Sequence, residues 1–525
     1  MDLDNEFIVH KYVKPNKIHK RLYQELLAAE AIEHDTLVVA PTGLGKTIVA
    51  VLLIAYVYSP EKSILFLAPT KPLVMQHKKK LEDVLNIPSE KIVLLTGQIP
   101  SSKRKEIYKQ NGIIICATPQ TIENDISENL INKNNFNLVI FDEAHRAVGD
   151  YSYVFISSFF TDVKRLGLTA SPGSDKLKIQ EVATNLSLNN IKIKTESDYD
   201  VIDYVQDMET DIIFCELDSF SKKISFLLTQ LIDKKISFLR KLNFSISTNY
   251  TRKELLQIQS QIIFRLKKSK NQIMFSALST VAGILKLFHA KELIETQGVV
   301  CFKNYINKMA IQDKDNKSSK ALLSILNSEE FKKISYLLSS ADLSKIVYEK
   351  ESKLLDIIND FVLTNPSSRI LVFNNFRDNA NHLVELLNKN KNIKAARFVG
   401  QATKFNDKGL SQKEQLLILN DFKQGVYNTL VCTSVGEEGL DIPSVDLVIF
   451  YDAVASEIRS IQRKGRTGRF NAGKVILLLN KNTIDEHYYY LSLRKEKKMK
   501  KLLSNPEVLK SPRRKSLQKT INDFS

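Results

Sequence analysis

The segment Ala40–Thr47 (Ala-Pro-Thr-Gly-Leu-Gly-Lys-Thr) has the residue types that hold the phosphates of a nucleotide. It follows the apolar run Leu37–Val39 and precedes an apolar helical stretch, which is the context that a Walker A phosphate loop requires. Glycines let backbone N–H groups converge on phosphate oxygens, and a helix N-terminus favours an anion. Lys46 would reach the β- and γ-phosphates, and Thr47 would ligate Mg²⁺. The residues expected to bind the nucleotide here are Thr42, Gly43, Gly45, Lys46 and Thr47.

Two acidic residues follow a later apolar run, Val139–Phe141. A carboxylate at the carboxyl end of a strand can hold a metal ion, and its neighbour can polarise the attacking water. We assign Asp142 to Mg²⁺ and Glu143 to the general base. An isolated Asp-Glu pair would more often be two exposed acids in a loop. The apolar run and the phosphate loop favour the catalytic interpretation.

The segment Gln462–Arg469 (Gln-Arg-Lys-Gly-Arg-Thr-Gly-Arg) places three arginines at a spacing of three beside glycines. Guanidinium groups brought from a second domain can stabilise charge on a transferring phosphoryl group, an effect of about 10³–10⁵ in rate. Arginine at this density could instead bind a nucleic-acid backbone. We favour the catalytic interpretation because a phosphate site of this kind needs a partner domain.

The phosphate loop, the acidic pair and the arginine segment are positioned by short β-branched apolar runs, which alternate with helical stretches. They occur in two series, one within residues 36–217 and one from residue 369 onward. Near-continuous apolar strands between helices indicate parallel sheets that are covered on both faces. We therefore predict two α/β domains. The runs are Leu37–Ala40, Ile64–Leu67, Ile113–Cys116, Leu138–Phe141 and Arg165–Leu168, followed by Ile370–Phe373, Ala396–Val399, Leu430–Thr433, Leu447–Phe450 and Val475–Leu478.

The segment between the two series predicts an all-helical insert. It contains no proline from Gly173 to Asn365, and its apolar residues recur at helical spacing. The last 30 residues are Lys-rich, contain two prolines and show little apolar periodicity, which indicates a flexible tail. The predicted domains are residues 1–205 (first α/β domain), 206–350 (helical insert), 351–495 (second α/β domain) and 496–525 (basic flexible tail).

Positive charge is concentrated in two parts of the chain. The formal net charge is +17, from 76 Lys and Arg and 59 Asp and Glu. Residues 221–350 hold 23 basic and 10 acidic side chains, and residues 494–525 hold 11 and 3. Concentrated positive charge suits a polyanion, because displacing counterions from phosphates drives binding. A lysine-rich solvated surface is the alternative.

Two classes of protein are disfavoured. The longest apolar run, Ile48–Tyr58, has 11 residues, which is short of the roughly 18 that a membrane span needs. We therefore expect no membrane partner. The four cysteines have no paired spacing, so a zinc ribbon or a disulfide scaffold is not expected.

In this order, the segments resemble the motifs of superfamily-2 helicases. The resemblance implies two RecA-like domains and an ATP-driven nucleic-acid motor. The matching segments are Arg21–Gln24 (the adenine-reading Q motif), Ala40–Thr47 (motif I), Ala68–Leu73 (Ia), Thr96–Gly97 (Ib), Thr118–Gln120 (Ic), Asp142–His145 (II), Leu168–Pro172 (III), Phe373–Arg377 (IV), Thr433–Asp441 (V) and Gln462–Arg469 (VI).

Three segments, Asp142–Gly149, Gly167–Gly173 and Thr433–Ile442, are similar to the Hef/FANCM family of fork-remodelling helicases. That family carries a helical insert between its RecA-like domains, and the insert contacts branched DNA. The resemblance implies an ATP-dependent DNA helicase or translocase with 3′–5′ polarity. It would act on stalled replication forks and Holliday-type junctions in DNA repair, in the cytoplasm and at the nucleoid of an archaeon. The chain has no Glu-Arg-Lys sequence, so we expect no XPF-like nuclease activity.

The resemblance also implies roles for single residues. Arg21 and Gln24 would bind the adenine, and Gly439 and Asp441 would position the nucleotide. Gln462 would organise the γ-phosphate and the water, with Arg466 and Arg469 as arginine fingers. His145, Thr169 and Ser171 would couple hydrolysis to domain movement. The expected strand-backbone contacts are Thr70, Lys71, Gly97, Thr118, Asn375, Gly400 and Thr433.

The C-terminal segment Gln518–Ser525 resembles a sliding-clamp-binding peptide. A short helical turn would place Ile521 beside Phe524 as an apolar plug, preceded by Gln518. A serine replaces the second aromatic residue, and a chance match in a polar tail is the alternative.

Two other functions fit the sequence. A double-stranded-RNA-stimulated ATPase of the Dicer-helicase or RNA-sensor type shares the motifs and the insert. A non-catalytic scaffold that only clamps DNA is the second alternative.

Overall fold

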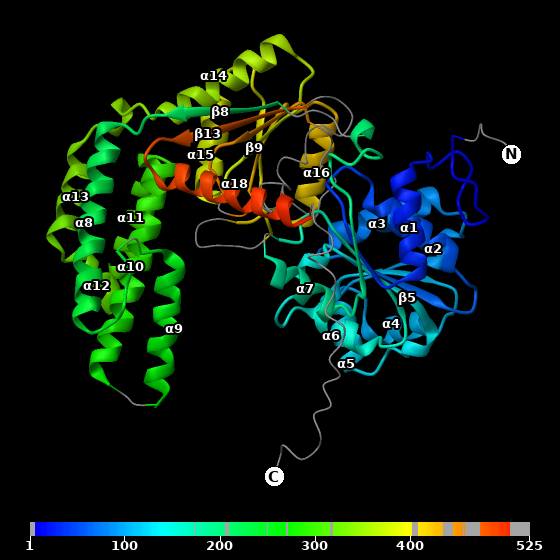
Figure 1. The fold of residues 1–525 in the computed structure, drawn as a ribbon. Coiled ribbons are helices and arrows are strands. Elements are labelled where there is room, and N and C mark those ends of the chain that lie inside the picture. Colours follow the sequence, from blue (N-terminus) through cyan, green and yellow to red (C-terminus); the bar gives the residue numbers. More distant parts are fainter. Residues whose placement is uncertain are drawn as a thin grey trace.

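Two parallel sheets and a bundle of helices make up the protein in the computed structural model (Figure 1). The structure describes residues 6–173, 175–204, 209–248, 250–268, 271–314, 319–401, 408–433, 445–454, 456 and 473–503. The second α/β domain lies between the helical bundle and the first α/β domain. The predicted fold class is confirmed in its main parts: two parallel-sheet α/β domains and an inserted helical domain.

The first sheet has seven parallel strands in the order β3-β4-β2-β5-β6-β1-β7. Its central strands are apolar at nearly every position, because side chains on both faces are buried. In β1, Val38 packs into the core on one face, and Leu37 and Val39 pack into the core on the other. The strands are β1 (Thr36–Val39), β2 (Ser63–Leu67), β3 (Ile92–Leu95), β4 (Ile114–Ala117), β5 (Phe136–Asp142), β6 (Lys164–Thr169) and β7 (Asn190–Ile193).

Helices cover both faces of this sheet. Apolar residues of α1, α2 and α3 form the core on one face, and those of α4, α5, α6 and α7 form the core on the other. The helices are α1 (Leu22–Glu33), α2 (Lys46–Val57), α3 (Lys71–Val84), α4 (Ser101–Tyr108), α5 (Pro119–Ser127), α6 (Ser152–Phe159) and α7 (Lys176–Asn185).

The second sheet has six parallel strands in the order β10-β11-β9-β12-β13-β8. Helices α14 and α15 cover one face, and α16 and the start of α18 cover the other. Its elements are β8 (Glu209–Cys215), β9 (Ile370–Phe373), β10 (Ala395–Phe398), β11 (Thr429–Cys432), β12 (Leu447–Phe450), β13 (Lys474–Asn480), α14 (Glu349–Thr364), α15 (Arg377–Leu387), α16 (Gln412–Lys423) and α18 (Ile484–Leu503).

Strand β8 corrects one predicted boundary. The predicted insert begins at residue 206, but residues 209–215 form β8, which pairs with β13 over seven residues at the edge of the second sheet. An edge strand pairs on one side only, and from Thr210 on exposed positions alternate with less exposed ones. The chain therefore joins the second sheet before it enters the insert and returns to it afterwards.

The insert, as far as its residues are described, is a bundle of six helices with its own apolar core. Helix α10 has the length and the composition of a membrane span, but it packs against α8, α9, α11 and α12. Those contacts are the ones that the central helix of a bundle makes. The helices are α8 (Ser219–Lys241), α9 (Arg252–Lys268), α10 (Gln272–Thr296), α11 (Val299–Lys314), α12 (Lys320–Leu326) and α13 (Glu329–Ser340).

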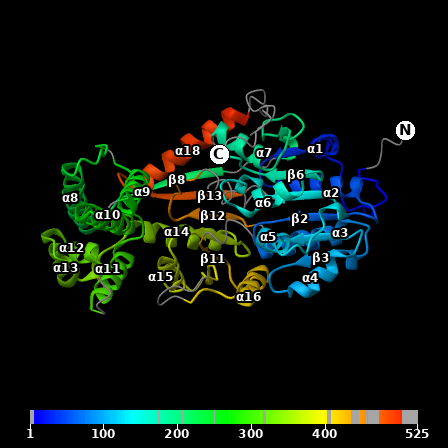
Figure 2. The same cartoon turned by 90° about the horizontal axis from the view of Figure 1, so that it is seen from below.

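Helix α18 corrects a second boundary, because the predicted tail began at residue 496 and the helix continues to Leu503. Met499 and Leu503, one helical turn apart, are buried in the core of the first domain. Lys500 also lies 3.8 Å from Glu196 of that domain. Helix α18 thus starts on the second sheet and ends beside α7 (Figures 1 and 2).

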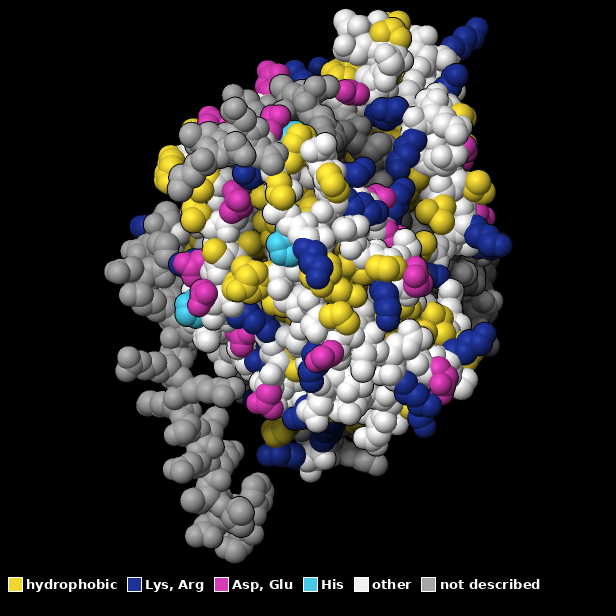
Figure 3. All heavy atoms as spheres, turned by 90° about the vertical axis from the view of Figure 1, so that its right-hand side faces the viewer, with side chains coloured by type: hydrophobic (Ala, Val, Ile, Leu, Met, Phe, Trp, Pro, Cys, Tyr) yellow, Lys and Arg dark blue, Asp and Glu magenta, His cyan; other side chains and the backbone are white. Residues whose placement is uncertain are grey.

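The outer face of the first domain is mixed in charge. In Figure 3, Lys and Arg side chains on this face are interspersed with Asp, Glu and apolar side chains. This agrees with the two basic segments, both of which lie outside the first domain's sequence.

Candidate functional site

The phosphate loop lies between β1 and α2, as the sequence predicts. Gly43 and Gly45 have φ angles of 92° and 71°, a left-handed conformation that side-chain-bearing residues rarely adopt. The side chain of Lys46 turns back over the loop, where its Nζ donates to the carbonyl oxygens of Ala40 (2.8 Å) and Pro41 (3.1 Å). The loop therefore combines glycine-permitted backbone with a cation held at the N-terminus of a helix, which suits a phosphate group.

The side chain of Gln24 is hydrogen-bonded to the backbone of the phosphate loop. Its amide Nε2 donates to the carbonyl oxygen of Leu44 at 3.0 Å, and the Tyr23 hydroxyl donates to the same oxygen at 2.9 Å. A Cβ atom on Gly45 would lie only 2.6 Å from Gln24 Nε2. Arg21 lies nearby, with its guanidinium 4.7 Å from the centre of the Tyr204 ring. The structure thus brings both expected adenine-binding residues to the loop, and their contact with the base stays a prediction.

Asp142 lies at the end of β5 among polar groups that hold its carboxylate ionised. Burial acts to raise its pKa, but His77 Nε2, 2.7 Å from Asp142 Oδ2, and the charge of Lys46 lower the pKa below its usual value. Burial raises the pKa of Tyr153 well above the usual range, so its hydroxyl stays protonated and donates to the Asp142 carbonyl oxygen at 2.7 Å. His77, on α3, is a residue that sequence reasoning missed.

Glu143, His145 and Thr169 form a line of polar groups from β5 to β6. Glu143 has a left-handed φ of 51°, and its Oε2 lies 3.3 Å from His145 Nδ1. Among the described residues, none makes a hydrogen bond with that oxygen. His145 Nδ1 is also 3.1 Å from Thr169 Oγ1, and Thr169 Oγ1 accepts from the Ser171 backbone N–H at 3.3 Å. The three predicted coupling residues therefore lie together beside the predicted base.

The oxygen atoms here fit Mg²⁺. Asp142 supplies an ionised carboxylate, and Thr47 supplies a hydroxyl at the first turn of α2. Mg²⁺ in nucleotide sites is held by one or two protein oxygens together with phosphate oxygens and water. The described residues contain no group of three or more His, Cys, Asp or Glu that could hold a metal ion.

Four first-domain residues that are expected to contact the backbone of a nucleic-acid strand lie at one end of its sheet, where the β-strands have their carboxyl ends. Thr70, Gly97 and Thr118 follow β2, β3 and β4, which are neighbours in the sheet. Thr70 and Thr118 are the N-cap residues of α3 and α5, so the start of a helix, which favours an anion, lies at both positions. Lys71 extends from the same edge to Gln98 Oε1, at 2.5 Å.

A buried ion pair, which sequence reasoning missed, ties this edge together. Arg104 on α4 donates through Nε and a terminal nitrogen to the carboxylate of Asp125 on α5, at 2.8 and 2.6 Å. The Tyr108 hydroxyl donates to the same carboxylate at 2.6 Å. Because α4 follows the Gly97 loop and α5 follows Thr118, the pair fixes those two positions relative to each other. A pairing across 21 residues leaves no local sequence signal.

The second domain repeats this arrangement. Asn375, Gly400 and Thr433 follow β9, β10 and β11, which are neighbours in the second sheet. The Asn375 backbone N–H donates to Asp452 Oδ2 at 2.8 Å, and the Gly400 carbonyl oxygen accepts from Arg377. In each domain, the structure therefore places the residues expected to contact the nucleic-acid backbone together, at the carboxyl ends of three neighbouring β-strands.

Several predicted residues lie outside the described part of the chain and stay predictions. They are Gly439, Asp441, Gln462, Arg466, Arg469, Gln518, Ile521 and Phe524.

Comparison with known proteins identifies the family. The helicase domain of Hef from Pyrococcus furiosus superposes with a TM-score of 0.67 and 42% sequence identity, over 90% of this chain and 97% of that one. The chain belongs to the Hef/FANCM family of superfamily-2 helicases. Helicases of this class are ATP-hydrolysing enzymes, and the matched helicase domains imply that the chain binds ATP.

Family descriptions match all three parts of this Hef/FANCM-type chain. Residues 13–174 match "Type III restriction enzyme, res subunit", and residues 349–471 match "Helicase conserved C-terminal domain". Residues 220–345 match "Putative ATP-dependent RNA helicase, helical bundle". This last match begins after β8, where the structure also begins the insert.

Two curated relatives are longer than this chain. A putative ATP-dependent RNA helicase of Methanocaldococcus jannaschii is 41% identical over 502 residues, which are 95% of this chain and 62% of that protein. The ATP-dependent DNA helicase mph1 of Neurospora crassa is 34% identical over 494 residues, which are 89% of this chain and 41% of that protein. The chain thus spans less than two thirds of either relative.

Proposed function

We propose that the protein is an ATP-dependent DNA helicase or translocase that acts on branched DNA, such as stalled replication forks and Holliday-type junctions, in DNA repair. The observation that carries the proposal is the pair of matching sheet edges, with Thr70 and Thr118 on one sheet and Asn375 and Thr433 on the other. Two such sheet ends in one chain offer a DNA strand two separate binding places, one on each domain, with a single phosphate loop for ATP. The basic surplus of residues 221–350 lies in the insert and suits the duplex arms of a junction.

The residues of the first domain divide the chemical work among themselves. Lys46 balances phosphate charge, and Asp142 with Thr47 would hold Mg²⁺, which supplies charge neutralisation at the phosphates. Glu143 accepts a proton from the attacking water. Arg466 and Arg469, approaching from the second domain, would stabilise charge as the phosphoryl group transfers.

Domain movement follows from this division. The two domains hold the nucleotide together only while its phosphates are intact, so hydrolysis releases one domain from the other. Alternating grips at the two sheet edges would convert this cycle into stepping along a strand, with 3′–5′ polarity by family. The Glu143–His145–Thr169 line would transmit the change from the phosphates to β6.

RNA is the second candidate substrate, because the names of the M. jannaschii relative and of the helical-bundle family both refer to RNA helicases. The deciding measurement is ATP hydrolysis stimulated by forked DNA, single-stranded DNA and duplex RNA at one salt concentration, since affinities at different salt cannot be compared. We expect the fork to give the largest stimulation. Stronger stimulation by duplex RNA would reverse the assignment.

Two further expectations belong to this proposal. The C-terminal peptide would bind a sliding clamp through Gln518, Ile521 and Phe524. Unchanged clamp affinity after removal of residues 518–525 would refute that. A DNA-acting enzyme of this family would work in the cytoplasm, at the nucleoid.

A further inference from the structure

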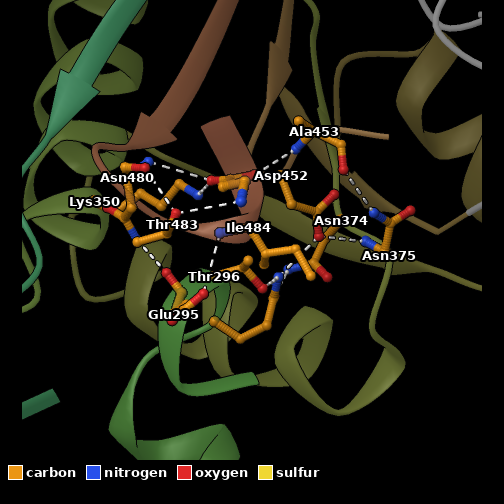
Figure 4. Close-up of polar contacts among 12 residues, drawn as sticks. Glu295, Thr296, Lys350, Asn374, Asn375, Asp452, Ala453, Asn480, Thr483 and Ile484 are labelled. Carbon is orange, nitrogen blue, oxygen red and sulfur yellow. Dashed lines mark hydrogen bonds and ion pairs between the residues drawn. The ribbon is translucent and has the colours of Figure 1, made fainter. Parts of the chain in front are cut away.

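Gln297 is a wholly buried polar residue at the junction between the helical insert and the second sheet. It directly follows Thr296, the last residue of α10, and precedes the turn into α11. Figure 4 shows this junction, where Glu295 at the end of the insert helix meets Asn480 and Ile484, and Asn374, Asn375 and Asp452 lie on the other side of Thr296. The strand-contact residue Asn375 thus lies close to the end of an insert helix.

The amide of Gln297 is bonded through both of its ends. Its Oε1 accepts from Asn374 Nδ2 at 2.9 Å and from Asn379 Nδ2 at 2.7 Å. Its Nε2 donates to Asp452 Oδ2 at 2.9 Å and to Thr296 Oγ1 at 2.9 Å. Three of these four partners belong to the second domain, on three different elements: the end of β9, helix α15 and the end of β12.

The partners of Gln297 also fix the backbone of the loop after β9. Asp452 Oδ2, which accepts from Gln297, accepts from the Asn375 backbone N–H at 2.8 Å as well. Asn374 Oδ1 accepts from the Phe376 backbone N–H at 2.7 Å. A shift of Gln297 therefore moves the groups that hold Asn375 in place.

A second set of bonds fixes the end of α10 itself. The Glu295 carbonyl oxygen accepts from Asn480 Nδ2 at 2.6 Å, and Glu295 Oε2 accepts from the Ile484 backbone N–H at 3.1 Å. Buried polar networks of this kind permit one arrangement, because any other leaves polar groups unpaired. The insert thus cannot rotate at this junction without breaking bonds to the second sheet.

We propose that Gln297 is a positioning residue that transmits the binding of DNA at the insert to the strand-contacting loop after β9, so that a branched substrate raises ATP turnover above the level given by single-stranded DNA. This inference rests on the proposed function, because that function assigns DNA to both the insert and Asn375. In the described part of the chain, the hydrogen-bond partners of Gln297 include no residue of the phosphate loop and none of the first domain's expected strand contacts.

The test compares ATP turnover stimulated by a fork with turnover stimulated by a single strand of the same length, at one salt concentration. In Gln297→Leu the fork-to-single-strand ratio should fall about fivefold or more toward one, the lower end of typical coupling between sites. The matched control is Glu330→Gln, which weakens a bond to Lys234 between α13 and α8 inside the insert and has no contact with the junction. The control should keep the ratio of the parent protein.

A reciprocal pair of substitutions separates positioning from general damage. Gln297→Glu removes the donor to Asp452 Oδ2 and places a like charge against it. Adding Asp452→Asn supplies a donor to the new carboxylate, but the same nitrogen can no longer accept from the Asn375 backbone N–H. The double variant should therefore recover stability that Gln297→Glu loses and keep the lowered ratio, and a restored ratio would overturn the path through Asn375. If Gln297→Leu does not fold, Asn379→Ala, which removes one donor to Gln297 Oε1, should lower the ratio in the same direction.

The outcomes distinguish this inference from the proposed function. A parent protein that no DNA stimulates refutes the proposed function. A parent that prefers the fork, together with a Gln297→Leu or Asn379→Ala variant that keeps the full ratio, overturns only the role of Gln297. An equal loss in Glu330→Gln overturns it as well, because the effect would then belong to the insert as a whole.

Discussion

His77 Nε2 lies 2.7 Å from Asp142 Oδ2, and this contact joins the helix that begins at the predicted DNA-contacting side of the first sheet to the predicted metal-binding carboxylate. Replacing His77 by alanine removes the partner of a buried, ionised carboxylate. We expect His77→Ala to lower the free energy of unfolding by about 1.5–3 kcal/mol, the range for hydrogen bonds to charged groups. Denaturant unfolding measures this change. The control His77→Gln keeps a donor and should lose less, and equal losses in both variants would contradict the contact's role.

The contact between Gly45 and Gln24 predicts a pair of effects on ATP binding. Gly45→Ala should weaken ATP binding by about tenfold or more, because it adds left-handed strain of about 1–3 kcal/mol and a clash with Gln24 Nε2. Gly43→Ala should weaken it less, since a Cβ there meets nothing within 4 Å. Gln24→Ala alone removes a predicted adenine contact and should also weaken ATP binding, but with the clash gone the double variant should lose less than the sum of the two single losses. Additive losses, measured by titration with a fluorescent nucleotide, would assign the whole effect of Gly45→Ala to the backbone.

Glu143→Gln should stop turnover and preserve nucleotide binding. The amide cannot accept the proton of the attacking water, so we expect ATP hydrolysis to fall about 10²–10⁴-fold. Nucleotide affinity, measured by equilibrium titration, should stay within a few-fold of the parent. A non-catalytic scaffold would instead keep its function in this variant.

Arg466→Ala separates an arginine finger from a backbone-binding arginine. As a finger, Arg466 should be worth about 10³–10⁵ in turnover, with DNA affinity unchanged. Arg466→Lys keeps the charge without the planar fork and should recover only part of the rate. A variant that loses DNA affinity and keeps turnover with saturating DNA would support the alternative role.

Lys350 forms a wholly buried ion pair with Asp485, which also accepts from the Ala453 backbone N–H at 2.8 Å. Lys350→Met leaves an unpaired buried carboxylate and should lower the free energy of unfolding by about 3–5 kcal/mol. Adding Asp485→Asn removes that charge, so the double variant should lose less than the single one. The surface pair Lys481–Glu216 supplies the control, because Lys481→Met should leave the unfolding midpoint unchanged. A similar loss in both single variants would contradict the importance of burial.

Much of the fold is predictable from local patterns. Near-continuous apolar runs indicate the strands of both sheets, and the stretch without proline indicates the helical insert. The phosphate loop and the acidic pair are contiguous segments, and each lies at the end of the strand that the pattern predicts.

The missed features depend on pairings that no local pattern reveals. Strand β8 begins with three polar residues and lies at the edge of the sheet, and only its pairing with β13 assigns it to the second sheet. Gln297 meets Asn374, Asn379 and Asp452 from 77 to 155 residues away. The end of α18 reads as a lysine-rich tail, since its apolar residues are identified only by the first-domain core that buries them.

The course of α18 has a consequence for the motor cycle. Its beginning is bonded to the second sheet through Asp485, and its end is buried in the first domain through Met499 and Leu503. When hydrolysis releases the nucleotide, helix α18 therefore keeps the two α/β domains close together, at a high effective concentration of each other. We expect the two domains to rotate about α18 in each cycle rather than to separate fully. Their closure around the next ATP should therefore be fast.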